Sequence, residues 1–235
     1  GVNEAETEEL SVYVVHSIYD KVLVEQRESR NFETPIQVGA ALTDKKLFAV
    51  RDDMGENISK KNKQYCELTA LYWMWKNDNS KYIGLSHYRR KFDLEGKQIV
   101  GALQSDVDVI VTVPVLNFDS VRRQYCKDHE ERDWDIMLEA IRKLYPEYLS
   151  AADAVQNGFF YYAYNMFITR KEIFDEYCEW LFAILAYCEK KIGVREDNYQ
   201  NRYIGFLAER LLTIYLTHNK QYRIAIAPKH FIESV

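Results

Sequence analysis

The sequence is poor in residues that interrupt regular structure and in residues that form covalent cross-links. Its 235 residues include 9 glycines, 4 prolines and 4 cysteines, and no two cysteines form a Cys-x-x-Cys pair. Widely spaced cysteines in apolar segments are typical of reduced thiols. The composition therefore excludes a small disulfide-stapled scaffold and predicts few long loops.

Long apolar runs and an excess of positive charge are also missing. No segment approaches the roughly 18 consecutive apolar residues of a membrane-spanning helix, and residues 1–9 are acidic, where a signal peptide is basic and then apolar. The net charge of -5 argues against a protein that coats nucleic acid. We expect a cytoplasmic protein with one domain at residues 10–235, preceded by a disordered acidic leader.

The hydrophobic pattern alternates between strand-like and helix-like segments. Predicted strands cover 10–16, 82–85, 108–114, 159–168 and 222–227, and predicted helices cover 61–76, 120–143, 171–191 and 199–217. This alternation predicts an α/β fold of three layers, with a mostly parallel central sheet flanked by helices. Ligands of such sheets bind outside the carboxyl ends of the strands.

A basic run follows the predicted strand at 82–85. His87, Arg89 and Arg90 place one titratable and two permanent hydrogen-bond donors at the carboxyl end of that strand. The arginine fork matches phosphate oxygens, so the run is a candidate phosphate site. An equally open interpretation is that the arginines are solvated surface charges.

Two glutamates lie in apolar helical segments. A buried carboxylate must be paired or have a raised pKa, and either state makes Glu67 and Glu209 candidate acids or bases. Glu209 could also simply pair with Arg202 or Arg210. His129 lies in a charged run that is typical of a solvated helix face.

The sequence offers no strong metal or nucleotide motif. Asp106 and Asp108 resemble an Asp-x-Asp metal signature, but they precede an apolar strand and so belong to the amino edge of the sheet. No glycine-rich phosphate loop, Ser-His-Asp order or zinc spacing is present. We therefore predict no required cofactor, with magnesium or manganese as the alternative.

Seven blocks, in order along nearly the whole chain, resemble one bacterial family, the domain of unknown function 4422. They are 35–40, 53–59, 62–73, 84–90, 165–168, 177–182 and 205–211. Members occur in capsular polysaccharide, exopolysaccharide and O-antigen gene clusters. The resemblance implies a glycosyltransferase with a glycosyltransferase-A-like nucleotide-sugar-binding fold, which uses a UDP-sugar such as UDP-galactose in its pyranose or furanose form.

The resemblance also implies roles for individual residues. His87 and the two arginines stand where related folds carry Asp-x-Asp, and they would neutralise the leaving diphosphate in place of a metal. Gly39 would permit close approach of the nucleotide. The sugar pocket would be lined by Asn57, Glu67 and Asn165, and the base would be Glu209 or His129.

The resemblance further implies a saccharide acceptor that is lipid-linked, with transient association at the inner face of the plasma membrane. A non-catalytic subunit that binds nucleotide sugars or carbohydrate is the main alternative. A sugar-phosphate transferase ranks last, because that chemistry recruits magnesium on several carboxylates, which the predicted strand ends lack.

Overall fold

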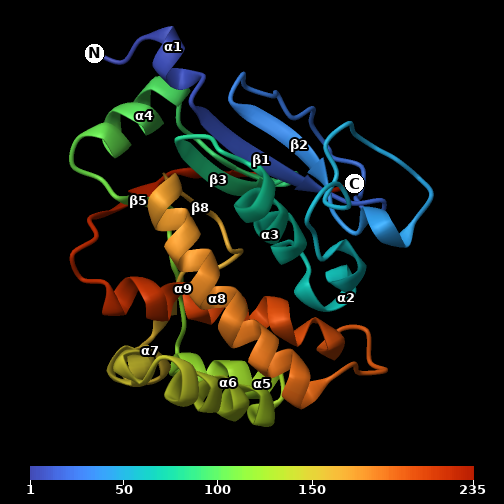
Figure 1. The fold of residues 1–235 in the computed structure, drawn as a ribbon, viewed down its shortest axis with the longest axis vertical. Helices are drawn as coiled ribbons and strands as arrows, with labels where there is room; N and C mark the ends of the chain where they lie inside the picture. Colours follow the sequence, from blue (N-terminus) through green and yellow to red (C-terminus); the bar gives the residue numbers. More distant parts are fainter.

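The computed structural model describes residues 1–235, which form a mixed β-sheet with helices on both faces (Figure 1). The sheet contains β1 (Leu10–His16), β2 (Glu33–Gln37), β3 (Tyr82–His87), β4 (Arg90–Phe92), β5 (Val109–Thr112), β8 (Phe167–Arg170), β9 (Ile224–Ala227) and β10 (Lys229–Phe231). The main helices are α3 (Leu68–Asn77), α4 (Gly96–Gln104), α5 (Val121–Asp128), α6 (Glu131–Leu144), α7 (Leu149–Asn157), α8 (Lys171–Ile192) and α9 (Tyr203–His218). None of the helices combines the length and the apolar character that a membrane span requires.

The strands follow the order β2-β1-β3-β8-β5-β9 across the sheet, and β4 and β10 extend from the end of β3. β1 is parallel to β2 and β3, and β5 is parallel to β9, whereas β8 is antiparallel to both of its neighbours. The predicted α/β fold with a mostly parallel sheet is confirmed, with β8 as the exception in the centre. The reversed direction of β8 brings the turn that precedes it to the carboxyl end of β3.

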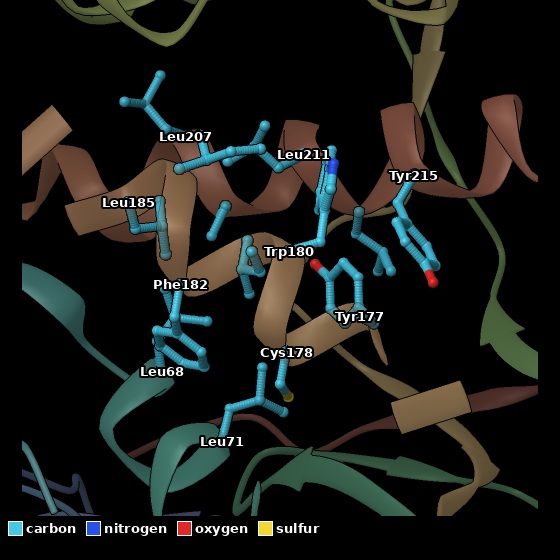
Figure 2. Close-up of a cluster of buried hydrophobic side chains, with 14 of the residues drawn as sticks. Leu68, Leu71, Tyr177, Cys178, Trp180, Phe182, Leu185, Leu207, Leu211 and Tyr215 are labelled. Atoms are coloured by element: carbon cyan, nitrogen blue, oxygen red, sulfur yellow. The ribbon is translucent and has the colours of Figure 1, made fainter. Parts of the chain in front are cut away.

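Three helices cover one face of the sheet. Side chains of α8 pack between those of α3 and α9, and Figure 2 shows Trp180 and Phe182 within this core. Ile83 and Leu85 of β3 point into the same core. Because side chains alternate along a strand, His87 projects toward this face as well. The opposite face packs against α4 through a smaller core.

Helices α5, α6 and α7 lie together at the end of the molecule away from β1 and β2 (Figure 1). The sequence predicts one helix over 120–143, but the chain leaves the helical conformation at His129 and Glu130, so α5 and α6 are separate. The predicted long helix at 171–191 is confirmed as α8. Gly193, with φ +77°, follows its end and donates its amide to Glu189.

The predicted helix at 61–76 is also divided. A short helix α2 (Asn62–Tyr65) ends at Cys66, whose φ is +54°, and α3 begins after Glu67. The Asn62 side chain bonds the Cys66 carbonyl and the Thr69 hydroxyl, and these bonds compete with a continuous helix. Glu67 therefore lies at the amino end of α3 rather than inside a helix.

Other predicted segments differ from the structure as well. The aromatic segment 159–168 is not one strand: β7 (Phe160–Tyr161) pairs with β6 (Val115–Leu116) in a separate ribbon, and β8 starts after a turn. The acidic leader, expected to be disordered, contains one helical turn, α1 (Glu4–Thr7), capped by Asn3. The strands β4 and β10 were too short for the sequence pattern to indicate.

Candidate functional site

His87 is the last residue of β3, and its ring is held by the turn before β8. The Nε2 atom lies 2.7 Å from the carbonyl oxygen of Tyr164. A carbonyl oxygen only accepts, so Nε2 carries the hydrogen and Nδ1 keeps its lone pair in the neutral ring. Burial lowers the pKa of His87, although the nearby Glu67 carboxylate opposes this. In the neutral ring the one N–H is used by the Tyr164 carbonyl, so the role of His87 toward a diphosphate stays a prediction.

The two predicted carboxylates meet at the same turn. Glu209 Oε2 accepts the backbone N–H of Tyr164 at 2.9 Å, and Glu67 Oε1 accepts the side-chain amide of Asn165 at 2.9 Å. Burial raises the pKa of Glu209, and the charge of Glu67 raises it further. Glu209 forms no ion pair, because the buried Arg210 guanidinium donates to the Phe206 carbonyl instead. A carboxylate in this setting is suited to general acid or base catalysis.

The turn that carries these contacts has an unfavourable backbone. Tyr164 and Asn165 are consecutive residues with φ of +70° and +53°, a region that residues other than glycine rarely adopt. Asn165 is only 1% exposed, and its Oδ1 atom has no hydrogen-bond partner. Backbone strain of this kind persists only where surrounding contacts impose it, and it gathers at functional sites. Asn165 thus adds an unused acceptor beside Glu67.

Positive side chains surround the aromatic ring of the same turn. The Arg90 guanidinium lies 3.9 Å and the Lys229 Nζ atom 4.6 Å from the centroid of the Tyr164 ring. Arg89 stacks on Phe231 at 5.0 Å and donates to a backbone carbonyl. None of the three cations forms an ion pair. Burial and the charge of Arg90 lower the pKa of Lys229. We call Arg89, Arg90 and Lys229 the cation cluster; its uncompensated charge is suited to an anionic ligand.

A buried ion triad holds the hairpin of β3 and β4 in place. Glu33 accepts from Arg27 Nη2 at 2.6 Å and from Arg30 Nε at 2.9 Å, and its side chain is 2% exposed. Arg27 donates to the carbonyls of His87 and Tyr88. Arg30 donates to the carbonyls of Phe92, the last residue of β4, and of Leu94. The two arginines of the triad therefore hold the segment that contains His87 and Arg90 by hydrogen bonds at its start and at its end.

Gly39 lies in a second structural hub, at the carboxyl end of β2. The fully buried Asp52 accepts the amides of Gly39 and Ala40 and the hydroxyls of Ser59 and Thr69. Gly39 has φ +65°, and a Cβ atom there would approach Asn62 Oδ1 to 2.7 Å. The conformation and packing of this turn are sufficient to require a glycine.

The side chains of Asn57 and His129 are engaged by groups other than Tyr164. The Asn57 side chain bonds the carbonyls of Asp53 and Gly55 and so closes its own loop. The His129 ring lies 4.0 Å from the Phe206 ring, and burial lowers its pKa. His129 is thus part of an aromatic group at the end of α5 and not the solvated helix-face residue that its charged neighbours indicate.

The aspartates of the Asp-x-Asp segment are engaged by arginines. Asp108 accepts from Arg170 Nη2 at 2.6 Å and from the Arg223 amide, while Asp106 pairs with Arg223 at 3.4 Å. No three or more His, Cys, Asp or Glu side chains are arranged to hold a metal ion. These two residues do not fit the metal role that the signature suggests.

The sequence pattern did not indicate that Lys229 and the peptide groups of Tyr164 belong to the site. β10 contains three residues, which is too short for a periodic signal, and it reaches the site only by pairing with β4. Tyr164 contributes through backbone groups and ring, so its residue type gives no motif. The sequence held one indication of this turn: the polar Asn165 follows Tyr164 within an otherwise aromatic and apolar segment.

Comparisons with known proteins agree with the predicted family. The chain is similar over 96% of its length to a solved structure described as the apo form of the bifunctional glycosyltransferase WbbM, with 29% sequence identity and a TM-score of 0.82. It spans 45% of that protein. No curated protein sequence matches significantly. The family profile described as domain of unknown function DUF4422 matches residues 14–220. The chain therefore belongs to the DUF4422 family.

Proposed function

We propose that the chain is a glycosyltransferase that transfers a sugar from a UDP-sugar donor to a saccharide acceptor. The observation that carries the proposal is the cation cluster, which lies against Tyr164 while the backbone of that residue bonds His87 and Glu209. Within one site, the unpaired cations can stabilise the charge of a leaving diphosphate, and the neighbouring carboxylates can accept a proton from an acceptor hydroxyl. The similarity to WbbM supports this assignment.

The fold supports a nucleotide-sugar site of the glycosyltransferase-A kind. A parallel set of strands ends at one edge of the sheet, and the antiparallel β8 brings its preceding turn to that edge. Ligands of α/β sheets bind outside such strand ends. We place the nucleotide at the carboxyl ends of β1, β2 and β3, with its diphosphate against the cation cluster.

The cation cluster would stabilise the charge that develops on the leaving UDP. Its guanidinium and ammonium groups are fixed by stacking on Tyr164 and Phe231, so little reorganisation accompanies bond cleavage. The sequence analysis assigned neutralisation of the diphosphate to His87 and the two arginines. In this proposal Arg90 and Lys229 neutralise the diphosphate.

Glu209 is the proposed general base. Its Oε2 atom is bonded to the Tyr164 amide, and its raised pKa makes the carboxylate a stronger proton acceptor than an exposed glutamate. Glu67 is a hydrogen-bond acceptor and the Oδ1 atom of Asn165 is an acceptor without a partner, so both can orient sugar hydroxyl groups. This arrangement favours Glu209 over His129, which lies in the aromatic group near Phe206.

The donor and acceptor follow from the family resemblance. We propose galactose, in pyranose or furanose form, as the transferred sugar and a growing, lipid-linked capsular polysaccharide or exopolysaccharide chain as the acceptor. The reaction would then take place at the inner face of the plasma membrane. We propose that the reaction requires no metal cofactor, because arginine and lysine side chains supply the positive charge.

Release of UDP from a panel of nucleotide sugars, with and without saccharide acceptors, tests the proposal. We expect one UDP-sugar to raise the melting temperature and to release UDP when an acceptor is present. Glu209→Gln should lower turnover at least about 100-fold, whereas His129→Ala should change it only a few-fold. A donor that binds without UDP release under any condition would instead show a non-catalytic binding subunit.

A further inference from the structure

The ribbon of β6 and β7 and the residues that adjoin it carry apolar side chains that nothing in the chain covers. The exposed fraction is 77% for Leu116, 108% for Phe118, 57% for Phe159 and 42% for Phe160. Leu116 and Phe160 are directly paired across the two strands. A group of protruding apolar side chains marks a surface that is covered by a partner or a membrane.

The chemistry of these side chains narrows the choice of partner. Leucine and phenylalanine have no hydrogen-bonding groups, so they cannot satisfy the hydroxyl groups of a saccharide. These side chains are instead suited to contact with the hydrocarbon chains of lipids. The full exposure of Phe118 gives a projecting wedge rather than a groove, and a wedge of this kind suits insertion among acyl chains.

Positive charge lies directly beside the apolar tip. Arg123 Nε and Lys127 Nζ are 3.6 and 3.4 Å from the same carboxylate oxygen of Asp119, the residue that follows Phe118. Two cations share one carboxylate, which leaves a net positive charge at the tip. Anionic headgroups would neutralise this charge, whereas a second copy of the chain would bring the same cations to the contact.

The ribbon also leads directly into the candidate site. Tyr164 is four positions after Phe160 in the sequence, and an extended chain rises about 3.3 Å per residue, so the two lie within about 13 Å. A membrane held by the ribbon would therefore lie next to the carboxylates that face the acceptor.

We propose that the exposed face of the β6–β7 ribbon, together with Arg123 and Lys127, docks the protein on an anionic lipid bilayer. This inference rests on the proposed function for its biological sense, because a lipid-linked acceptor would be presented at the same surface. Docking itself requires neither donor nor acceptor. Binding to vesicles and release of UDP can therefore fail independently.

Co-sedimentation with vesicles of phosphatidylcholine alone, or with a fraction of phosphatidylglycerol, provides the test. The wild-type chain should bind the anionic vesicles, and the double variant Leu116→Ser, Phe118→Ser should lower the partition coefficient about 100-fold, tenfold for each apolar anchor removed. Lys127→Gln should lower it about fivefold on anionic vesicles only. Val22→Ser removes an apolar side chain of similar exposure from a segment outside the ribbon and should have no effect.

Two results would overturn the proposal. The first is equal vesicle binding by the double variant and the wild-type chain, with unchanged melting temperatures for both. The second is a wild-type dimer, by light scattering, that the double variant converts to monomer without any vesicle binding, since the ribbon would then join two copies of the chain.

Discussion

Replacing Glu33 by glutamine tests whether the buried triad holds the β3–β4 hairpin. The side chain is 2% exposed and accepts hydrogen bonds from both Arg27 and Arg30. Glutamine has nearly the same shape, but it removes the negative charge between two arginines. Arg27 is 8% exposed at its side chain, so its charge would remain buried without a partner.

The loss of stability that this substitution causes can be estimated from the burial of the ion pairs. Removing one partner of a buried ion pair costs about 3–5 kcal/mol, and the amide oxygen of glutamine recovers a part of the hydrogen bonding. We therefore expect the free energy of unfolding to fall by about 3 kcal/mol. For a chain of this length, such a loss lowers the melting temperature by about 6–12 °C.

The pKa of Glu33 gives the prediction a pH dependence. Burial alone would raise this pKa, but the hydrogen bonds and charges of Arg30 and Arg27 outweigh burial and lower it. A lowered pKa in the folded state contributes stability above the ordinary carboxyl pKa, and that stability is lost as the pH falls through the lowered value. The difference between wild type and variant should accordingly be full at pH 7 and shrink in acid.

Urea unfolding at pH 7 and at pH 3 measures both effects. Glu131→Gln is the matched control, because Glu131 is 67% exposed and pairs with Arg122 on the surface. It should change the free energy of unfolding by less than about 0.5 kcal/mol. A Glu33→Gln variant as stable as this control at pH 7 would refute the role of the triad.

Three further predictions concern single residues. Arg90→Met should raise the donor KM about 10- to 100-fold with the melting temperature unchanged, since one charge-assisted contact to the diphosphate is lost; unchanged steady-state kinetics would argue against the cation cluster. Glu209→Gln should make the protein more stable at pH 8, because a raised carboxyl pKa in the folded state costs stability once the pH exceeds the ordinary carboxyl pKa, and the gain should vanish at pH 4; urea unfolding at both pH values measures it, and a loss of stability at pH 8 would contradict the assigned pKa direction. Gly39→Ala should lower the free energy of unfolding by about 1–3 kcal/mol, since the new side chain must adopt φ +65° and displace Asn62; a neutral result would mean that the turn relaxes freely.

The hydrophobic pattern of contiguous residues correctly predicted the strands and helices whose formation depends mainly on their own sequence. β1 and α8 match the expected ranges closely, because a β-branched apolar run and a long amphipathic repeat are properties of contiguous residues. The basic run after β3 was placed at the correct edge of the sheet for the same reason. Pairing direction was not predictable for β8, since nothing within its four residues specifies which neighbours it joins.

The parts that were missed depend on distant contacts. The turn at Tyr164 and Asn165 is held by a partner 98 residues away, through the bond from Asn165 to Glu67. The break at Cys66 depends on the side chain of Asn62, which no hydrophobic pattern reveals. Lys229 reaches the site through β10, which pairs with a strand more than 130 residues earlier. His129 was assigned by its charged neighbours in sequence, whereas its ring packs against Phe206 in space.

Tyr164 belongs to both halves of the candidate site. Its ring lies against Arg90 and Lys229, and its peptide groups bond His87 and Glu209. A ligand that shifts the cations must therefore also shift the residue that orients the carboxylate. We expect donor and acceptor to bind cooperatively and in a preferred order, with each raising the affinity for the other by the same factor.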